Sequence, residues 1–378
     1  MSDLPRLLSF TLDGWPVLGG PVTITLNDGV AVLVGRNGAG KSAILEGFKA
    51  ISAFVMGESD RFLYNSNDVP KTLIIEILTS SNRRLQYKCK RLNFSHPSNE
   101  KCQYLDQAQE LIWKTENGGT FVQSYPDQTI ILGYQSFVSL DPSDLPQTLE
   151  LKLPNEQRWI RSILEGVRLI GKYPIRISSD RRLSRLEVID TVPQASKGWR
   201  FSREEELPSV LTNVIHSIGS DELELVCQRI GLGNKIKQKK FERNGEQEYD
   251  FEVELDGVNI GLLSDGTLRV LSILVEIIAP YLSRTIMIEE PETQIHPGML
   301  EKLLNEIESY TYGQNLILST HSPHVVSWTK PDKINVVYRE NERTFVRKLA
   351  TNEIENVVEY LNEEGNLGDW IYSGILDE

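Results

Sequence analysis

The sequence predicts an α/β fold with a mostly parallel sheet, an antiparallel β subdomain and an inserted helical region. Near both ends of the chain, short apolar runs typical of buried strands alternate with segments whose apolar residues recur at helical spacing. Such alternation implies strands linked through helices, and therefore a largely parallel sheet. Between residues 72 and 135, alternating segments are instead joined by turn signals such as Asn117-Gly118, which predict antiparallel hairpins.

The composition is that of an ordinary globular protein, with 378 residues of which 40% are hydrophobic and 25% charged. No apolar run approaches the length of a membrane span, and no basic-then-apolar leader begins the chain. We therefore expect a cytoplasmic protein with no membrane partner. Three scattered cysteines, Cys89, Cys102 and Cys227, suit reduced thiols rather than a disulfide framework or a zinc site.

The net charge of −13 argues against a surface that coats nucleic acid, because binding to phosphates needs clustered Lys and Arg. It does not exclude a local basic groove. The basic run at residues 235–240 and the smaller cluster of Arg181, Arg182 and Arg185 are the two candidates. Each pattern is more typical of a solvated face than of a DNA contact.

The pattern divides the chain into three regions. Residues 1–140 form an N-terminal lobe with a glycine-rich loop and the β subdomain, residues 141–233 form the helical insertion, and residues 234–378 form a C-terminal lobe. In the first lobe, apolar or alternating runs predict the following elements: strands at 7–12, 22–26 and 31–34, a helix at 43–51, hairpins at 72–79 with 84–91 and 111–115 with 120–123, and a strand at 129–135.

The rest of the chain changes first to helical periodicity and then back to alternation. In the insertion, the pattern predicts helices at 154–168, with Pro154 in the first turn, and at 207–218 and 221–230. It also predicts a short strand at 173–177. The last region predicts these elements: a hairpin at 235–243 with 248–255, helices at 268–278, 297–310 and 354–361, and strands at 285–288, 316–319, 334–339 and 344–349. No heptad or longer repeat is present, so no coiled-coil arm is expected.

A glycine-rich segment between the strand at 31–34 and the helix at 43–51 matches a phosphate-binding loop. Residues 35–42, Gly-Arg-Asn-Gly-Ala-Gly-Lys-Ser, fit the pattern G-x-x-x-x-G-K-[ST]. In that pattern backbone N–H groups close on phosphate oxygens, the lysine reaches the β/γ-phosphates and the serine hydroxyl meets Mg²⁺. The competing interpretation is a glycine-rich turn that binds nothing. The predicted nucleotide contacts are Asn37, Gly38, Ala39, Gly40, Lys41 and Ser42, with Lys41 also catalytic and Ser42 also a Mg²⁺ ligand.

Two acids follow the apolar strand at 285–288, within Glu289-Glu290-Pro291-Glu292. The carboxyl edge of a parallel sheet is where α/β proteins place ligands. Metal-assisted phosphoryl transfer needs an acidic group for Mg²⁺ and a group that orients the attacking water. We assign Glu289 to Mg²⁺, through water, and Glu290 to positioning or deprotonating the nucleophile. The competing interpretation is an exposed acidic turn.

His321 directly follows the strand at 316–319, inside Ser-Thr-His-Ser-Pro. An imidazole there would sense the γ-phosphate and hold the water in line. A lone histidine at a strand end is more often a surface residue, and that interpretation is kept for the other histidines: His96, His216, His296 and His324.

The segment Leu263-Ser264-Asp265-Gly266-Thr267 precedes the helix at 268–278. A serine hydroxyl, glycine N–H groups and a helix N-terminus together suit an anion. Taken locally, a plain helix cap explains the segment better. The order of motifs along the chain favours the binding role of Ser264 and Gly266.

That order resembles the ABC-type/AAA ATPase heads of the SMC and RecF group, and more closely the stand-alone ATPases related to OLD-family and Septu-type phage-defence proteins. The pieces that carry the resemblance lie at both ends of the chain: 35–42 with Ile44-Leu45-Glu46, 263–267, 288–292 with Ile295-His296-Pro297, and 319–323. Residues 52–230 match only in outline. The family fold is an ABC-ATPase head with a P-loop.

The resemblance implies a homodimer with ATP sandwiched between subunits. Ser264 and Gly266 of one chain would then meet the γ-phosphate held by Lys41 of the other. Gln135 would be the glutamine that contacts Mg²⁺ in the family; the alternative is that it is an ordinary polar residue. Arg181 would be the basic residue that many relatives carry after a similar strand.

Three departures from the family pattern refine the resemblance. Glu289 replaces the usual aspartate of the Mg²⁺ acid pair, a change common in the OLD-like branch. The signature Ser-Asp-Gly-Thr differs from Ser-Gly-Gly-Gln and argues against a transporter subunit. After His321 we find no acidic cluster of a TOPRIM nuclease, which OLD enzymes carry.

These features lead to one functional hypothesis and two alternatives. We expect an ATPase that uses ATP and Mg²⁺ and whose ATP-dependent dimerisation, or assembly into a larger complex, controls a separate effector protein, a nuclease or toxin, in antiphage defence. The first alternative is a DNA-repair ATPase of the RecF/SMC type, with residues 235–240 and Arg181 on the nucleic acid backbone. The second is a nucleotide-gated scaffold that hydrolyses little ATP.

Overall fold

The computed structural model describes residues 5–55, 69–78, 84–91, 107–114, 120–125, 160, 162–171, 184–186, 207–242, 249–278, 285–349 and 353. Several sequence predictions lie outside these residues: the strands at 129–135 and 173–177, the helix at 354–361, and the roles of Gln135 and Arg181. No helix within the described residues is both long enough and apolar enough to cross a bilayer.

A six-stranded central sheet has the order β16-β15-β3-β14-β13-β8. Its strands are β3 (Val30–Val34), β8 (Arg168–Ile170), β13 (Thr285–Glu289), β14 (Asn315–Thr320), β15 (Ile334–Glu340) and β16 (Arg343–Lys348). All neighbours pair in parallel except β15 with β16, which form an antiparallel hairpin. Every residue of β13 and β14 is buried, because a parallel sheet covered on both faces leaves no strand face for water. The predicted mostly parallel sheet is confirmed.

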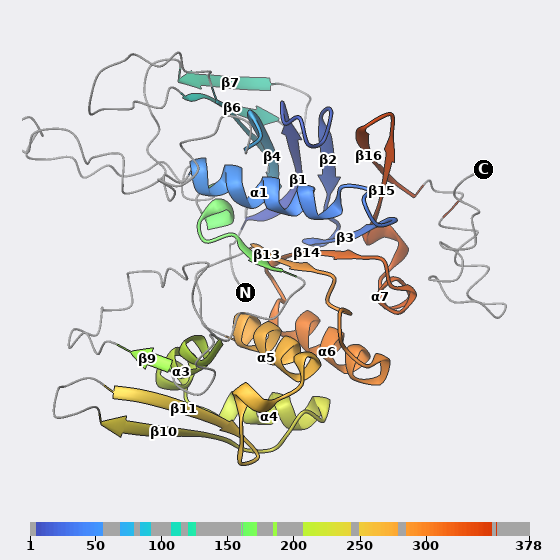
Figure 1. Cartoon of the computed structure of the whole chain (residues 1–378). Coiled ribbons are helices and arrows are strands. Elements are labelled where there is room, and N and C mark those ends of the chain that lie inside the picture. Colours follow the sequence, from blue (N-terminus) through green and yellow to red (C-terminus); the bar gives the residue numbers. More distant parts are fainter. Residues whose placement is uncertain are drawn as a thin grey trace, which may run out of the picture.

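Helices cover both faces of this sheet (Figure 1). One face carries α1 (Lys41–Val55), and the other carries α5 (Asp265–Ile278), α6 (Pro297–Tyr310) and the short α7 (Pro323–Trp328). Side chains of the strands alternate between the two faces and so join two different cores. Leu33 and Ile317 belong to the core on the α1 side, whereas Val32 and Leu318 belong to the core packed by α5 and α6.

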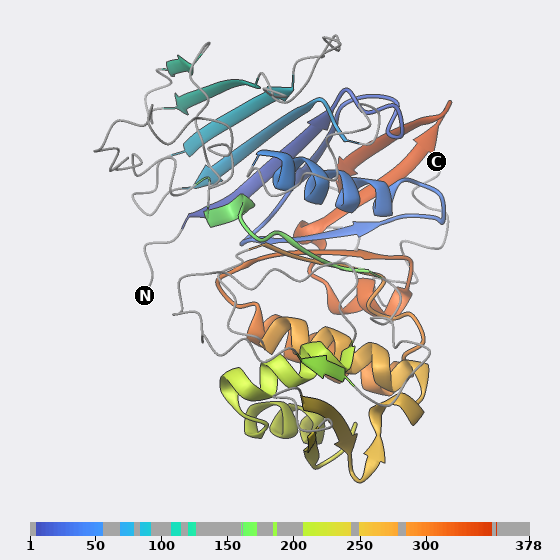
Figure 2. The same cartoon turned by 60° about the vertical axis from the view of Figure 1, so that its left-hand side comes forward.

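The antiparallel β subdomain is also confirmed, as a second six-stranded sheet in the order β2-β1-β4-β5-β6-β7. It consists of β1 (Arg6–Asp13), β2 (Val22–Thr25), β4 (Thr72–Leu78), β5 (Arg84–Arg91), β6 (Gln107–Lys114) and β7 (Thr120–Tyr125). Helix α1 lies between this sheet and the central one, as Figure 2 shows. Phe48 of α1 meets Phe10 of β1 there, with ring centroids 4.2 Å apart.

The third unit lies beyond α5 and α6 and contains most of the described part of the predicted insertion. Helices α3 (Leu207–Ile218) and α4 (Asp221–Ile230) pack beside a small sheet, β10-β11-β12, with β9 on β11. Its strands are β9 (Ser184–Leu186), β10 (Ile236–Glu242), β11 (Tyr249–Leu255) and β12 (Val258–Asn259). Two 3₁₀ turns, η3 (Ile260–Leu262) and η4 (Pro331–Lys333), precede α5 and β15 in the chain.

One predicted helix is wrong at its end. The helix expected to run to Arg168 stops before Gly166, whose φ of 63° lies in the left-handed region that ends helices. Arg168 instead begins β8, which pairs with β13 at the edge of the central sheet. The region expected to be helical therefore also contributes a strand to the central sheet.

The packing of α1 against the β subdomain can be tested at Gly47. A Cβ atom there would stand 2.5 Å from the buried Trp15 ring. Gly47→Ala should therefore lower the free energy of unfolding by about 1–3 kcal/mol, although alanine favours an isolated helix by about 1 kcal/mol. Gly298→Ala in α6 is the matched control, because the nearest atom to its new Cβ is 3.6 Å away, and it should be neutral or stabilising. Urea unfolding followed by circular dichroism measures both; a stabilising Gly47→Ala would contradict this packing.

Candidate functional site

The loop between β3 and α1 has the conformation that its glycines allow. Gly38 and Gly40 have φ angles of 80° and 107°, values that residues with a Cβ adopt only at a cost. A Cβ on Gly38 would meet open space, so this part of the loop faces outward. The Lys41 side chain is only 5% exposed, and its Nζ donates hydrogen bonds to the carbonyls of Gly35 at 2.7 Å and Arg36 at 3.0 Å. The ammonium group of Lys41 therefore contacts the main chain of the loop that is predicted to bind phosphate.

The β15–β16 hairpin holds the loop from behind, which the sequence did not predict. A Cβ on Gly35 would collide with the Val337 carbonyl, and one on Gly40 would stand 2.5 Å from the Thr344 hydroxyl. That hydroxyl donates to the Ala39 carbonyl at 3.2 Å. Two loop glycines thus leave room for the hairpin, a long-range constraint with no local sequence signal apart from the glycines themselves.

Ser42 and Glu289 meet although they are far apart in sequence. The Ser42 hydroxyl donates to Oε1 of the buried Glu289 carboxylate, at the end of β13. A hydroxyl and a carboxylate are oxygen ligands of the kind that Mg²⁺ prefers, and Mg²⁺ usually takes one or two carboxylates with phosphate oxygens and waters. Within the described residues, no group of three or more His, Cys, Asp or Glu could hold a metal alone. Ser42 and Glu289 therefore fit as part of a Mg²⁺ site that other oxygen ligands would have to complete.

Glu290 occupies a strained backbone position directly after β13. Its φ of 44° is unusual for a residue other than glycine and is typical of functional sites. Its N–H donates to the Ser319 carbonyl at 2.8 Å, and its carbonyl accepts from Thr293 N–H at 3.0 Å. These bonds to β14 and to the following turn fix the direction in which the Glu290 carboxylate leaves the strand.

His321 lies beside Glu290, at the end of β14. Its Nδ1 is 3.5 Å from Oε1 of Glu290, and the side chain is 42% exposed. The predicted base and the predicted γ-phosphate sensor are thus neighbours, on the edge of the sheet that also carries the phosphate loop. Their catalytic roles stay predictions.

Arg269 is a site residue that sequence inspection missed. It is wholly buried in α5, and its guanidinium donates to the carbonyls of Glu289, at 2.8 Å, and Gly171. Burial lowers the pKa of Arg269 to about 10, while the charges of Glu289, Glu292 and Glu290 act to raise it. The group therefore stays protonated at neutral pH and places a positive charge behind three carboxylates. An arginine inside the apolar run 268–278 was the available signal.

The signature segment is held within its own chain. The Ser264 hydroxyl accepts a hydrogen bond from Thr267 N–H at 3.2 Å, which caps α5. A Cβ on Gly266 would collide with the Gln294 carbonyl, so the segment packs on the turn after β13. Ser264 itself is exposed, and Leu262 beside it is 70% exposed. A role of Ser264 and Gly266 toward a second subunit stays a prediction.

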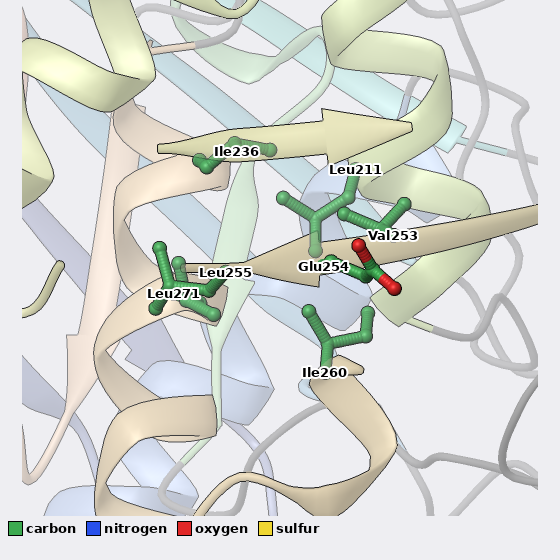
Figure 3. A pocket seen from close by; sticks show the side chains of 7 residues that line it. All are labelled: Leu211, Ile236, Val253, Glu254, Leu255, Ile260 and Leu271. Atoms are coloured by element: carbon green, nitrogen blue, oxygen red, sulfur yellow. The ribbon is translucent and has the colours of Figure 1, made fainter. Parts of the chain in front are cut away.

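Acidic residues face the basic run at 235–240. Lys239 pairs with Glu254, which raises the pKa of Lys239, and Lys235 lies 3.6 Å from Glu224. This pairing lowers the positive charge that the run offers to nucleic acid. A small recess beside β10 and β11 is shown in Figure 3. Seven side chains line it: Leu211, Ile236, Val253, Glu254, Leu255, Ile260 and Leu271. The recess has no room for a water molecule and is a packing gap rather than a ligand site.

Comparison with known proteins adds one family match. Residues 152–327 match the family model described as "AAA domain, putative AbiEii toxin, Type IV TA system". The match spans less than half of the chain and begins after the phosphate loop, but it includes Ser264, Glu289, Glu290 and His321. No curated protein matches the sequence significantly.

Solved structures of SMC heads align over nearly the whole chain at low identity. An Smc head bound to the C-winged-helix domain of ScpA shares 14% identity with a TM-score of 0.46, covering 92% of this chain and 99% of that one. An SMC head from Thermotoga maritima shares 13% with a TM-score of 0.40, covering 92% and 100%. A Pyrococcus furiosus Smc head bound to the C-terminal domain of ScpA shares 12% with a TM-score of 0.45, covering 95% and 100%.

The α/β fold with its phosphate loop, together with the family match, supports an ATPase of the AAA/ABC type. Strand β3, the glycine-rich loop and helix α1 follow one another in the order of a P-loop. The closer kinship to OLD-like or Septu-type ATPases stays a prediction.

The structural role of Arg269 can be measured directly. Arg269→Leu leaves the Glu289 and Gly171 carbonyls without their donor, and should lower the free energy of unfolding by about 3 kcal/mol. Arg229→Leu is the control, because Arg229 pairs with Glu306 at 2.7 Å on a partly exposed surface. It should cost at most about 1 kcal/mol. Urea unfolding of both variants measures these free energies. Equal decreases in the two variants would show that Arg269 contributes no more to stability than an exposed ion pair.

Proposed function

We propose that this protein binds and hydrolyses ATP. The observation that supports the proposal best is the convergence of Lys41, Ser42, Glu289, Glu290 and His321 on one edge of the central sheet. Lys41 and the N–H groups of residues 37–42 would hold the phosphates, and Ser42 with Glu289 would hold Mg²⁺. When bound, Mg²⁺ supplies positive charge that offsets the negative charge of the β- and γ-phosphates.

Glu290 and His321 would act on the attacking water and the γ-phosphate. We assign Glu290 to accept the proton of that water, because hydrogen bonds hold its main chain on both sides and His321 lies beside it. His321 would hold the outer oxygens of the γ-phosphate through its exposed ring. This pairing favours hydrolysis over a scaffold that only binds nucleotide.

We also propose that ATP joins two copies of the chain. Ser264 is exposed, next to the exposed Leu262, so a second copy could reach it. The cap that Ser264 makes with Thr267 leaves the Ser264 hydroxyl at the N-terminus of α5, where backbone N–H groups favour an anion. In this arrangement the nucleotide held by one Lys41 would be completed by Ser264 and Gly266 of the other copy.

ATP-dependent pairing would regulate a separate effector, a nuclease or toxin, in antiphage defence. Support comes from the resemblance to OLD-like and Septu-type ATPases and from the family description, which names a putative toxin of a toxin–antitoxin system. The alternative of a DNA-repair ATPase is less well supported, because acidic neighbours face Lys235 and Lys239. The cytoplasm is the expected location of this activity.

Glu290→Gln tests the chemistry. The amide cannot accept the proton of water, so phosphate release should fall by at least about 100-fold, while binding of ATP to the loop persists and ATP-bound pairs accumulate. Phosphate release and light scattering after gel filtration measure the two effects. Glu301→Gln, at an exposed position of α6, should behave as the wild type. Unchanged turnover in Glu290→Gln would show that another group is the base.

Ser264→Arg tests the shared site. The bulky cation would obstruct the face that a second copy should meet, but it lies in a different segment from the phosphate loop. ATP affinity of the single chain should stay within about twofold, whereas ATP-driven pairing should be lost. Equilibrium binding of a fluorescent ATP analogue and sedimentation velocity distinguish these quantities. A variant that still pairs with ATP would contradict a role of Ser264 at the interface.

A further inference from the structure

Glu292 is a partly buried carboxylate to which neither the sequence nor the proposed chemistry gives a role. It lies three residues after the end of β13, and its side chain is 10% exposed. Oε1 accepts hydrogen bonds from the Thr320 hydroxyl at 2.7 Å and from the His321 backbone N–H at 3.2 Å. The carboxylate therefore joins the turn after β13 to the end of β14.

The same carboxylate oxygen faces the His321 ring. Oε1 of Glu292 is 3.6 Å from Nδ1 of His321, and Oε1 of Glu290 is 3.5 Å from that nitrogen. Among the described residues, Nδ1 is buried without a hydrogen-bond partner, and so is Oε2 of Glu292. The Nδ1 edge of the ring thus lies between two carboxylates, and the exposed part of the side chain is the remainder of the ring.

The backbone of this turn is tied down independently of the ring. The Thr320 hydroxyl donates to Glu292 and accepts a hydrogen bond from Ser322 N–H at 2.9 Å. Thr320 is wholly buried, so these bonds are shielded from water. The left-handed conformation of Glu290 turns the chain so that Glu290 and Glu292 both face His321. The Glu292 oxygen therefore controls both the main chain at His321 and one edge of its ring.

We propose that Glu292 is a positioning residue for His321, which orients the imidazole toward the γ-phosphate. Without the carboxylate, the His321 N–H loses its acceptor and the ring can turn about its Cβ–Cγ bond. The inference rests on the proposed ATP hydrolysis for its effect on rate, but the orientation of His321 exists without nucleotide. The two parts can therefore be measured separately.

The first measurement uses no nucleotide. The protein has five histidines, so ¹⁵N-histidine labelling gives a short spectrum in which His321→Gln identifies the His321 signals. Glu292→Ala should shift the backbone amide signal and the ring nitrogen signals of His321. Glu292→Gln, whose amide oxygen can replace Oε1, should shift the backbone signal less. Thr320→Val removes one donor to Glu292 and keeps the shape, and should also shift the His321 signals.

The matched control is Glu306→Gln. Glu306 has a similarly buried side chain, 13% exposed, and pairs with Arg229 on α4, away from His321. It should leave every His321 signal unchanged. If Glu292→Ala and Thr320→Val both leave the His321 signals at their wild-type positions in folded protein, as judged by circular dichroism, the inference is overturned.

The second measurement is a double-mutant cycle in ATP turnover. His321→Ala should lower kcat by about 100-fold, and Glu292→Ala should lower it by at least about tenfold, with the KM for ATP within about twofold in both. The double variant should be no slower than His321→Ala, because a positioning residue has nothing left to position. A purely structural role would lower the thermal midpoint instead, without this coupling.

Two results separate this inference from the proposed function. If the wild type hydrolyses ATP but Glu292→Ala keeps its kcat, or the losses in the double variant multiply, the role of Glu292 is overturned and the ATPase stands. If the wild type releases no phosphate, the proposed function fails, and the histidine spectra alone decide: shifted His321 signals support the positioning by Glu292, and unshifted ones overturn it.

Discussion

The parallel pairing of β3, β14 and β13 is the constraint on which the site depends. Lys41 and Ser42 are about 250 residues away from Glu289 in sequence, yet the Ser42 hydroxyl reaches the Glu289 carboxylate. The register makes this possible, because Ser319 of β14 pairs with Leu33 of β3 on one side and with Glu289 of β13 on the other. Parallel strands end at the same edge, so the residues that follow each strand meet there. A slip of one residue would reverse the faces of β14 and separate its end from both neighbours.

The sequence predicted the centre of this arrangement well, for a physical reason. Strands buried on both faces need apolar residues throughout, so β13 and β14 were predicted nearly to their ends from apolar runs alone. The short β8 was not predicted, because it has three residues, of which only Ile170 is buried, and so gives no such run. The order of the strands in the sheet could not be predicted from local sequence patterns either. It depends on which strands share a core, as Leu33 and Ile317 do on the α1 side of the sheet.

Side chains of the site were predictable only where they follow a recognisable strand or motif. Lys41, Glu290 and His321 meet that condition. Arg269 and Thr344 act through long-range contacts with the carbonyls of Glu289 and Ala39. The arginine in an apolar helical run marks Arg269 as unusual, but neither segment reveals the partner of its side chain. Glu292 is an intermediate case, visible as an acid but not as a partner of Thr320. Its bonds explain why Glu-Glu-Pro-Glu and Ser-Thr-His-Ser-Pro belong together: the two segments form one hydrogen-bonded unit.

The strain at Glu290 follows from the same geometry. Glycine would adopt a φ of 44° without cost, but it has no carboxylate. The proposed role of Glu290 therefore needs a side chain at a backbone conformation that disfavours one. Such strain is of the order of 1–3 kcal/mol, and the surroundings must impose it. Glu290 N–H donates to Ser319, Thr293 N–H donates to the Glu290 carbonyl, and Arg269 holds the preceding carbonyl of Glu289. These three bonds fix the peptide planes on both sides of Glu290. The direction of its carboxylate therefore depends on the edge of the sheet and on α5. A substitution that breaks the hydrogen bonds of either one would change the orientation of the Glu290 carboxylate without replacing Glu290 itself.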